Sequence, residues 1–377
     1  MGLCIGVVVE TAPGERRVAL TPEVLGKLLA AGARVLLQRG AGEPAGLPDE
    51  LYQGADFRDS GTAVLGEAGL LLKVAPPSPE QVAAMQPGSV VVGFLQPHRH
   101  LDMVRALLDR RITSLAMELV PRISRAQSMD ALSSQAAVAG YKAVLVGAAT
   151  LDKFMPMLTT AAGTIRPAQA LVVGAGVAGL QAIATARRLG AIVEAFDVRS
   201  ETREQIESLG ARFIDTGVTA EGEGGYAREL TAEEQQQQRE ALASRIAKAD
   251  LVVTTAAVPG RPAPRIIDRA TVERMPAGAV IVDLAAESGG NCELTRPGET
   301  VQHGGVRIIG PVNLAATVAR HASEMYARNL YNLLQPALRD GELAIDWEDE
   351  VFAGTVLTRD GELLHAPTRA LLEEGSQ

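Results

Sequence analysis

The sequence predicts an α/β protein with two doubly wound, Rossmann-like parallel-sheet domains, joined by long helices and separated by a cleft. Short apolar runs alternate with helical patterns along most of the chain, which is typical of parallel sheets covered by helices. A glycine motif directly follows one of these runs. The length of 377 residues is enough for two domains with sizeable cores.

The first series of apolar runs lies before residue 120 and resembles buried parallel strands. Helical patterns separate the runs, for example at Thr21–Ala30, where Pro22 suits a first turn, and at Leu101–Arg111. The expected strands are Leu3–Val9, Arg34–Leu37, Leu70–Val74, Ser89–Phe94 and Ile112–Met117.

A second series of strands is expected around and after the glycine motif, and two long helical stretches, Ser128–Leu151 and Leu314–Leu338, are the expected connectors. The later connector would return the chain to the first domain. This predicts a discontinuous N-terminal domain (residues 1–127 plus about 325–377) and a nucleotide-binding domain (residues 128–324). A dinucleotide at the strand ends would lie in the cleft between them. The later strands are Ala191–Phe196, Arg212–Ile214, Leu251–Thr255, Ala279–Leu284 and Val306–Ile309.

The glycine motif is Gly174-x-Gly176-x-x-Gly179, between an apolar strand pattern and a helical pattern. In a dinucleotide-binding turn, Gly174 makes the tight bend, Gly176 lets the backbone approach a pyrophosphate, and Gly179 lets the helix pack on the strand. The start of the helix then offers unpaired N–H groups to the phosphates. An ordinary βαβ unit with a glycine-rich turn is the alternative.

Asp197 ends the next strand, at about the 20-residue spacing expected for the acid that binds the adenosine ribose. Its carboxylate accepts hydrogen bonds from ribose hydroxyls and repels a 2′-phosphate, so it favours NAD(H) over NADP(H). Arg199 and Arg203 lie nearby and weaken this preference, because arginine pairs well with phosphate.

Charge and composition exclude several other classes. The net charge of −9 argues against a nucleic-acid partner. Cys4 and Cys292 are far apart without metal-ligand spacing, which indicates a reducing cytosol and no metal site. The best candidate for a membrane span, Ala136–Leu151, contains Lys142 and is shorter than the ~20 apolar residues that a span needs. We therefore expect a soluble chain.

Residues Asp215–Gln238 interrupt the alternation of strands and helices. Their first half is acidic and glycine-rich with one aromatic residue, Tyr226, and four glutamines close the segment. Long loops of this kind are lids or spacers, and composition alone favours a spacer.

Several segments carry a family resemblance. Arg122–Tyr141 and Asn291-Cys292-Glu293 are its specific parts, and the remaining segments are Arg16–Pro22, the glycine motif, Gly224–Arg228, Thr254–Pro264 and Val282–Glu293. Together they resemble the NAD(H)-binding component, or alpha subunit, of proton-translocating NAD(P)+ transhydrogenase. The remaining segments are shared with a sister family, alanine dehydrogenase.

The resemblance implies roles for particular residues. One loop would position the nicotinamide, with Gln127 bonding its carboxamide and Arg122 pairing with Asp130 to fix the loop; Ser133 completes the catalytic candidates. A mobile loop at about residues 215–233 would close over the nucleotide with Tyr226. The implied cofactor-binding residues are Gly174, Gly176, Val177, Ala178, Gly179, Asp197, Val198, Arg199, Tyr226 and Ala256.

Hydride transfer between two nicotinamides supports these roles, since it requires positioning groups and no general acid or base. The resemblance further implies a homodimer, NADP(H) on a partner subunit, and a membrane-spanning proton-channel subunit. Because this chain has no span, we expect that subunit to be a separate polypeptide. The expected location is cytoplasmic, peripheral to the inner membrane.

Two alternatives remain at this point. Alanine dehydrogenase would use Arg17 and Lys73 as substrate-binding cations, although Lys73 would otherwise simply snorkel to solvent. Its histidine base would fall at Gln96, which cannot take a proton, with His98 two residues away, and its catalytic aspartate would fall near Glu287. The other alternative is a non-catalytic module that senses NAD(H).

Overall fold

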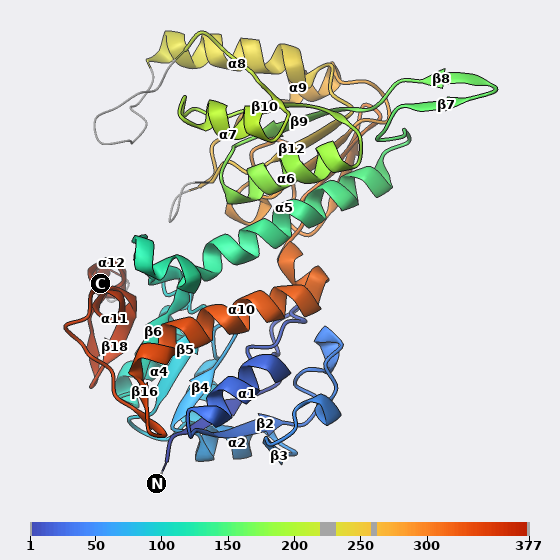
Figure 1. Ribbon diagram of the computed structural model, residues 1–377. Helices are drawn as coiled ribbons and strands as arrows, with labels where there is room; N and C mark the ends of the chain where they lie inside the picture. Colours follow the sequence, from blue (N-terminus) through green and yellow to red (C-terminus); the bar gives the residue numbers. More distant parts are fainter. Residues whose placement is uncertain (1, 219–230, 258–261, 375–377) are drawn as a thin grey trace. The chain divides into compact units, whose positions relative to one another are not determined.

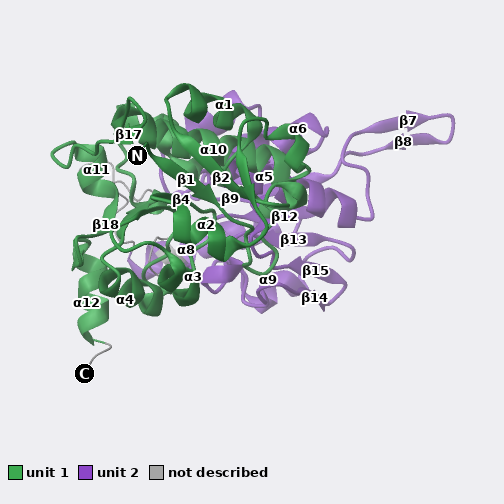
Figure 2. Ribbon diagram, turned by 90° about the horizontal axis from the view of Figure 1, so that it is seen from below, with its two compact units in different colours: residues 1–135, 316–377 green, residues 136–315 purple. Residues whose placement is uncertain are grey.

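The computed structural model describes residues 2–218, 231–257 and 262–374, and the chain divides into two compact units (Figure 2). Unit 1 comprises Met1–Gln135 and Ala316–Gln377, and unit 2 comprises Ala136–Ala315. The sequence prediction placed the divisions at 127/128 and 324/325. The observed divisions, 135/136 and 315/316, fall inside the helices α5 (Ala131–Thr150) and η7 (Leu314–Val318). A helix that continues across a division gives no sequence signal for its exact position.

Unit 1 is built on an eight-stranded sheet of order β19-β18-β6-β5-β4-β1-β2-β3. The strands from β3 to β6 are parallel, and β18 joins β6 antiparallel. The chain therefore winds outward from β1 in both directions. The strands are β1 (Cys4–Val7), β2 (Arg34–Gln38), β3 (Asp56–Arg58), β4 (Leu70–Leu72), β5 (Val90–Gly93), β6 (Thr113–Ala116), β18 (Val356–Arg359) and β19 (Glu362–Leu363).

Helices cover both faces of this sheet, which explains why its central strands β1, β4 and β5 are apolar along their length. Leu36 packs in a core with α2, α3 and α4, whereas its neighbours Val35 and Leu37 pack in a second core with α1 and α10. Adjacent side chains on a strand point to opposite faces, so each strand serves both cores. The helices are α1 (Pro22–Ala30), α2 (Gly61–Glu67), α3 (Pro79–Ala84), α4 (Leu101–Asp109), α10 (Ala319–Leu334), α11 (Glu350–Thr355) and α12 (Ala366–Glu374).

Unit 2 repeats this winding in a seven-stranded sheet of order β11-β10-β9-β12-β13-β15-β14. All neighbours are parallel except β14, which is antiparallel at one edge. The predicted fold class, two doubly wound α/β domains with parallel sheets, is confirmed. The strands are β9 (Gln169–Val173), β10 (Ile192–Phe196), β11 (Arg212–Phe213), β12 (Leu251–Thr254), β13 (Val280–Asp283), β14 (Thr300–His303) and β15 (Val306–Ile309).

Helices α5, α6 and α7 pack on one face of the unit 2 sheet, and α8 and α9 pack on the other (Figure 1). A β-hairpin of β7 (Leu158–Thr160) and β8 (Gly163–Ile165) projects away from the rest of unit 2 (Figures 1 and 2). The helices are α5 (Ala131–Thr150), α6 (Val177–Arg188), α7 (Thr202–Ser208), α8 (Ala232–Ile246) and α9 (Arg269–Glu273).

Helix α8 corrects the predicted extent of the interruption after Asp215. The interruption expected to extend to Gln238 ends earlier, because α8 already begins at Ala232. Thr231 caps it: Glu234 N–H donates to the Thr231 hydroxyl at 3.2 Å, and Thr231 N–H donates to the Glu234 carboxylate at 2.9 Å. This capping box was visible in the sequence and is a stronger signal than the polar composition of the segment.

In unit 1, Tyr326 of α10 anchors the helix to the ends of two strands. Its hydroxyl donates to the Lys73 carbonyl at 2.8 Å and accepts from Phe94 N–H at 3.2 Å. The side chain is fully buried, and this burial raises its pKa well above the ordinary value for tyrosine. The hydroxyl is therefore neutral at physiological pH and serves both main-chain groups.

We expect Tyr326→Phe to destabilise unit 1 by about 1–3 kcal/mol, because it leaves two buried main-chain groups without this partner. Urea denaturation measures the change. Tyr331→Phe, on the same helix with a half-buried ring, is the control and should change stability by less than about 0.5 kcal/mol. Equal stabilities of the two variants would contradict the anchoring role.

Candidate dinucleotide-binding site

The glycine turn of unit 2 requires glycine for two physical reasons. Gly174 has φ +96°, and a Cβ there would lie 2.6 Å from Thr255 Oγ1. A Cβ on Gly179 would lie 1.8 Å from the Gly174 carbonyl oxygen. By contrast, a Cβ on Gly176 would meet no atom within 4 Å. The turn is therefore tightly packed at Gly174 and Gly179, and it has free space at the exposed Gly176.

Helix α6 starts at this open side. Gly176 is its N-cap and has no side chain with which to cap the first turn. The first two helical residues, Val177 and Ala178, are exposed and half-buried respectively. Such a helix start presents N–H groups and a positive dipole end, which suit the phosphates of a dinucleotide.

Asp197 follows β10 and binds back to the turn. One carboxylate oxygen, Oδ2, accepts from Ala175 N–H at 2.7 Å, and the other, Oδ1, accepts from Arg199 N–H at 2.9 Å. The Arg199 guanidinium adds contacts of 3.0 and 3.1 Å. Burial alone would raise the pKa of Asp197, but these hydrogen bonds outweigh it and hold the pKa below its ordinary value. The carboxylate is therefore charged at neutral pH.

Thr255 and Ala256 follow β12 on the opposite side of the turn. Thr255 N–H donates to the Val173 carbonyl at 2.8 Å, and its hydroxyl donates to the Gly174 carbonyl at 3.0 Å. The ends of β10, β9 and β12 thus meet at the point where the sheet order reverses, which is where α/β sheets bind ligands. Val198 is exposed beside Asp197, and Tyr226 lies outside the described residues.

Arg203 also has a partner in unit 2. Its guanidinium lies 2.6 Å from the Asp215 carboxylate, and the Arg199 guanidinium binds Asp197. Both arginines that weakened the preference for NAD(H) are therefore neutralised by neighbouring carboxylates.

In unit 1, the candidate catalytic loop contains the short 3₁₀ helix η4 (Ser124–Met129), and Arg122 and Gln127 are exposed on it. Asp130 follows, and its carboxylate accepts from Ser133 N–H at 2.8 Å and from the Ser133 hydroxyl at 2.6 Å. Asp130 is thus the N-cap of α5. Among the described residues the Asp130 carboxylate is bonded to Ser133, and the predicted Arg122–Asp130 ion pair does not form.

Two asparagines that the sequence analysis missed hold this loop. Asn329 and Asn332 of α10 both donate to the Ser128 carbonyl, at 2.8 and 3.0 Å. The carbonyl of the Asn329 side chain also accepts from the Ser134 hydroxyl at 2.7 Å. Their i, i+3 spacing places them on one helix face, and this was the signal available in the sequence.

Lys73 contradicts the prediction that it snorkels to solvent. It is 1% exposed, and its Nζ lies 2.7 Å from Oε2 of Glu10, which is also buried. Arg17 is buried as well, bonded to Glu15 at 2.6 Å and to Gln135 at 2.8 Å. Both cations have carboxylate partners from the segment after β1, so neither needs solvent.

The position expected for a histidine base holds Gln96, in the segment that follows β5. Gln96 has φ +44°, and the N–H groups of Leu95 and Gln96 donate to the Glu118 carboxylate. His98 is exposed, and the Glu287 carboxylate accepts from Asn313 N–H at 2.8 Å. A carboxamide does not take up a proton at neutral pH, so Gln96 provides no base at this position.

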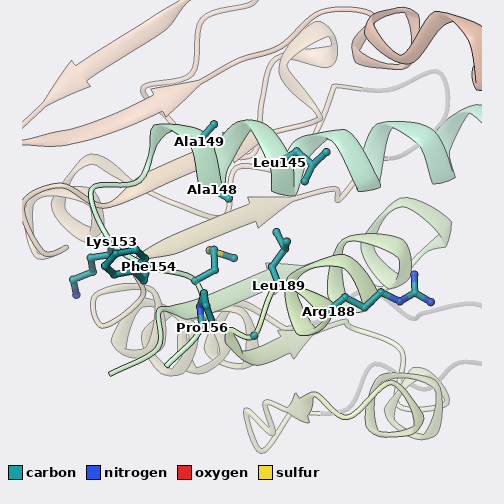
Figure 3. Close-up of a pocket in the computed structure, with 10 residues that line it drawn as sticks. Leu145, Ala148, Ala149, Lys153, Phe154, Pro156, Arg188 and Leu189 are labelled. Carbon is teal, nitrogen blue, oxygen red and sulfur yellow. The ribbon is translucent and has the colours of Figure 1, made fainter. Parts of the chain in front are cut away.

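An apolar hollow in unit 2 lies apart from the glycine turn. It borders the C-terminal end of α6, whereas the turn borders the N-terminal end, so the hollow is not the expected nucleotide site. Figure 3 shows its lining side chains, which come from α5, α6 and the segments that follow them: Leu145, Ala148, Ala149, Lys153, Phe154, Met155, Pro156, Arg188, Leu189 and Gly190.

No described helix has the length and apolarity needed to cross a membrane. Within the same residues, no three His, Cys, Asp or Glu side chains group as metal ligands would.

The sheet order, the glycine turn and the acid after the second strand define a Rossmann-type dinucleotide-binding protein. Comparison with known proteins is consistent with this class. The model of the alanine dehydrogenase/PNT N-terminal domain matches residues 6–139, and that of the C-terminal domain matches residues 143–366. The chain belongs to the alanine dehydrogenase/PNT family.

Three relatives refine this placement. An NAD(P) transhydrogenase subunit alpha chain from Rhodospirillum rubrum is 46% identical over 374 residues, which cover 96% of this chain and 97% of the relative. The crystal structure of transhydrogenase from Sinorhizobium meliloti has a TM-score of 0.88 at 43% identity and covers 96% of this chain and 99% of that chain. Alanine dehydrogenase from Mycolicibacterium smegmatis is 32% identical over 300 residues, covering 78% of this chain and 76% of the relative. The predicted resemblance, with alanine dehydrogenase as the sister family, is confirmed.

Proposed function

We propose that this chain is the NAD(H)-binding subunit of a proton-translocating transhydrogenase. It holds NADH for direct hydride transfer to NADP+ on a partner subunit, and a separate membrane subunit couples the transfer to proton movement. The closed glycine turn, with the charged Asp197 beside it, is the observation that carries the proposal, and the similarity to transhydrogenase alpha subunits supports it.

The residues of the site fit a dinucleotide. The space at Gly176 and the start of α6, whose N-cap glycine has no side chain, suit a pyrophosphate, and the carboxylate of Asp197 suits ribose hydroxyls. When bound, the nicotinamide supplies the hydride chemistry. Gln127 has an exposed side-chain amide, which orients the carboxamide of the nicotinamide. The hydrogen bond between Ser133 and Asp130 fixes the start of α5, which follows Gln127 in the chain. No proton moves at the reacting carbons, so the site needs no base.

The partners follow from the same proposal. The sequence contains a single G-x-G-x-x-G motif, so NADP(H) is carried by another subunit. A membrane subunit would keep this chain at the cytoplasmic face of the inner membrane. Exposed apolar side chains near the projecting hairpin support a homodimer, because apolar surface of this kind commonly marks an interface: Phe154 (53% exposed), Met157 (64%), Leu158 (36%) and Ile165 (47%).

Alanine dehydrogenase is the second candidate, favoured by the sequence relatives of that name and by the buried cations Arg17 and Lys73. Against it stands Gln96 at the base position. A module that only senses NAD(H) would have the same glycine turn. It would differ from a transhydrogenase subunit only in supporting no hydride transfer.

The purified chain should not oxidise L-alanine with NAD+, because it lacks a base at Gln96. It should support hydride transfer between NAD(H) and NADP(H) only when an NADP(H)-binding transhydrogenase subunit is added. Absorbance assays with and without that subunit measure both activities. Alanine-dependent NADH formation would favour the dehydrogenase, and NADH binding without transfer in the assembled complex would favour the sensing module.

The chain should bind NADH more tightly than NADPH, since the charged Asp197 would meet the 2′-phosphate. Asp197→Ala should narrow the difference in binding free energy by about 1–3 kcal/mol. Arg199→Ala is the opposite perturbation: it removes the guanidinium that neutralises Asp197, so it should widen the difference in binding free energy between NADH and NADPH. Calorimetric titration of both nucleotides measures this, and equal affinities in the wild type would refute the assignment of Asp197.

Gln127→Asn should slow hydride transfer much more than it weakens NADH binding. The shorter side chain shifts the amide by more than about 1 Å, and a misplacement of about 1 Å costs on the order of a hundredfold in rate. Single-turnover kinetics of the complex and NADH calorimetry separate the two effects. Gln53→Asn, at another exposed glutamine of unit 1, should change neither. Parallel losses of rate and affinity would argue against a positioning role.

A further inference from the structure

The family-specific asparagine, Asn291, has a defined position in unit 2 that the proposed function leaves unused. It follows β13 and is 0% exposed. Its main chain is held by Asp283, which ends β13 and is also fully buried. The carboxylate of Asp283 accepts from the N–H groups of Asn291 at 2.7 Å and of Cys292 at 3.0 Å.

Asp283 is a rigid anchor because three further groups bind it. Thr254 Oγ1 and Ala285 N–H donate to its Oδ1 at 2.9 and 3.0 Å, and Thr295 Oγ1 donates to its Oδ2 at 2.7 Å. Five hydrogen bonds to one buried carboxylate offset the cost of its burial and fix the surrounding main chain.

The side-chain amide of Asn291 makes the two main-chain hydrogen bonds that a neighbouring strand would otherwise make. Its oxygen accepts from Ala256 N–H at 3.0 Å, and its nitrogen donates to the Ala256 carbonyl at 2.8 Å. The second amide hydrogen goes to the Pro264 carbonyl at 2.9 Å. One side chain therefore satisfies both main-chain groups of Ala256, beyond the end of β12 where sheet pairing has stopped.

Ala256 is the residue through which this network reaches the glycine turn. A Cβ on Gly174 would lie 3.2 Å from Ala256 N and 2.6 Å from Thr255 Oγ1. Thr255 also donates its hydroxyl to the Gly174 carbonyl at 3.0 Å. Thr255 and Ala256 therefore form a wall against Gly174, the first glycine of the turn, and a shift of Ala256 would displace this wall.

The order of strands shows which half of a dinucleotide this wall serves. The sheet runs β10-β9-β12, with the glycine turn after the central β9. Asp197, the ribose-binding candidate, lies on the β10 side, so the adenosine half belongs there. Ala256 lies on the β12 side, toward which the nicotinamide half must extend.

We infer that Asn291 is a positioning residue for the nicotinamide half of NAD(H), acting through the main chain of Ala256 and Thr255. The inference rests on the proposed function, since it requires a dinucleotide at the glycine turn. Asn291 itself does not need to touch the nucleotide. It holds the β12 side of the turn in the binding conformation, which removes an ordering cost from association.

The test measures NADH and AMP affinities of the full-length chain by calorimetry. Asn291→Ala should weaken NADH binding by about tenfold or more, the size expected for losing buried hydrogen bonds. AMP occupies only the adenosine half, so its affinity should change by less than about twofold.

Thr295→Val is the matched control. It removes one hydrogen bond from the same carboxylate of Asp283, but Thr295 has no bond to Ala256. This variant should lower the thermal midpoint and leave both nucleotide affinities within about twofold of wild type. If Asn291 were merely structural, Asn291→Ala would resemble Thr295→Val: at equal thermal stability, both variants would keep the wild-type affinities for NADH and AMP. That result would overturn the inference.

Thr255→Val provides a second perturbation if Asn291→Ala does not fold. It removes the hydroxyl that binds Gly174 and leaves Asn291 intact, so NADH affinity should fall and AMP affinity should not. In the variant that combines Asn291→Ala with Thr255→Val, the loss of NADH affinity should be smaller than the product of the two single losses. Both substitutions disturb the same series of contacts, which runs from Asn291 to Gly174. Unchanged NADH affinity in Thr255→Val, or equal losses for NADH and AMP, would overturn the inference.

The inference and the proposed function fail in different ways. A wild-type chain that binds neither nucleotide would contradict the proposed function. A wild-type chain that binds NADH, with an Asn291→Ala variant that binds it equally well, would contradict the role of Asn291 alone.

Discussion

The contact between the glycine turn and the main chain beside it is the constraint on which the site in unit 2 depends. Gly179 packs on the carbonyl of Gly174, and Gly174 in turn packs on Thr255, with no room for a Cβ at either glycine. Hydrogen bonds from Asp197 on one side and Thr255 on the other keep the turn in place. A rigid turn of this kind binds phosphates without first having to be ordered.

Unit 1 shows a different balance of forces around its buried charges. The pairs Lys73–Glu10 and Arg17–Glu15 lie in a largely apolar unit, where removing the charges from water is costly. Excellent geometry and added main-chain hydrogen bonds compensate: Val74 N–H donates to Glu10 at 2.6 Å, and Arg17 N–H donates to Glu15 at 2.9 Å. Replacing only one member of a pair would leave an uncompensated buried charge, so the members of each pair depend on one another.

Patterns local in the chain were sufficient for much of the fold. Continuous apolar runs predicted the central parallel strands, because a strand with helices on both faces favours apolar residues at successive positions. The long polar segment after Asp215 was less well predicted: its capping box at Thr231 starts a helix in spite of the four glutamines. Polar composition is a weak guide there, since glutamine is a good helix former.

The sequence by itself determined the fold class, the glycine turn and the acid that follows it, because each depends on spacing along one βαβ unit. Only the tertiary structure decided the partners of the polar side chains. Lys73 meets Glu10, and Asn291 holds Ala256, although the members of each pair lie far apart in the sequence. These partners are brought together by strand order and helix packing, and a buried polar group takes whichever complementary group the fold places within hydrogen-bond distance.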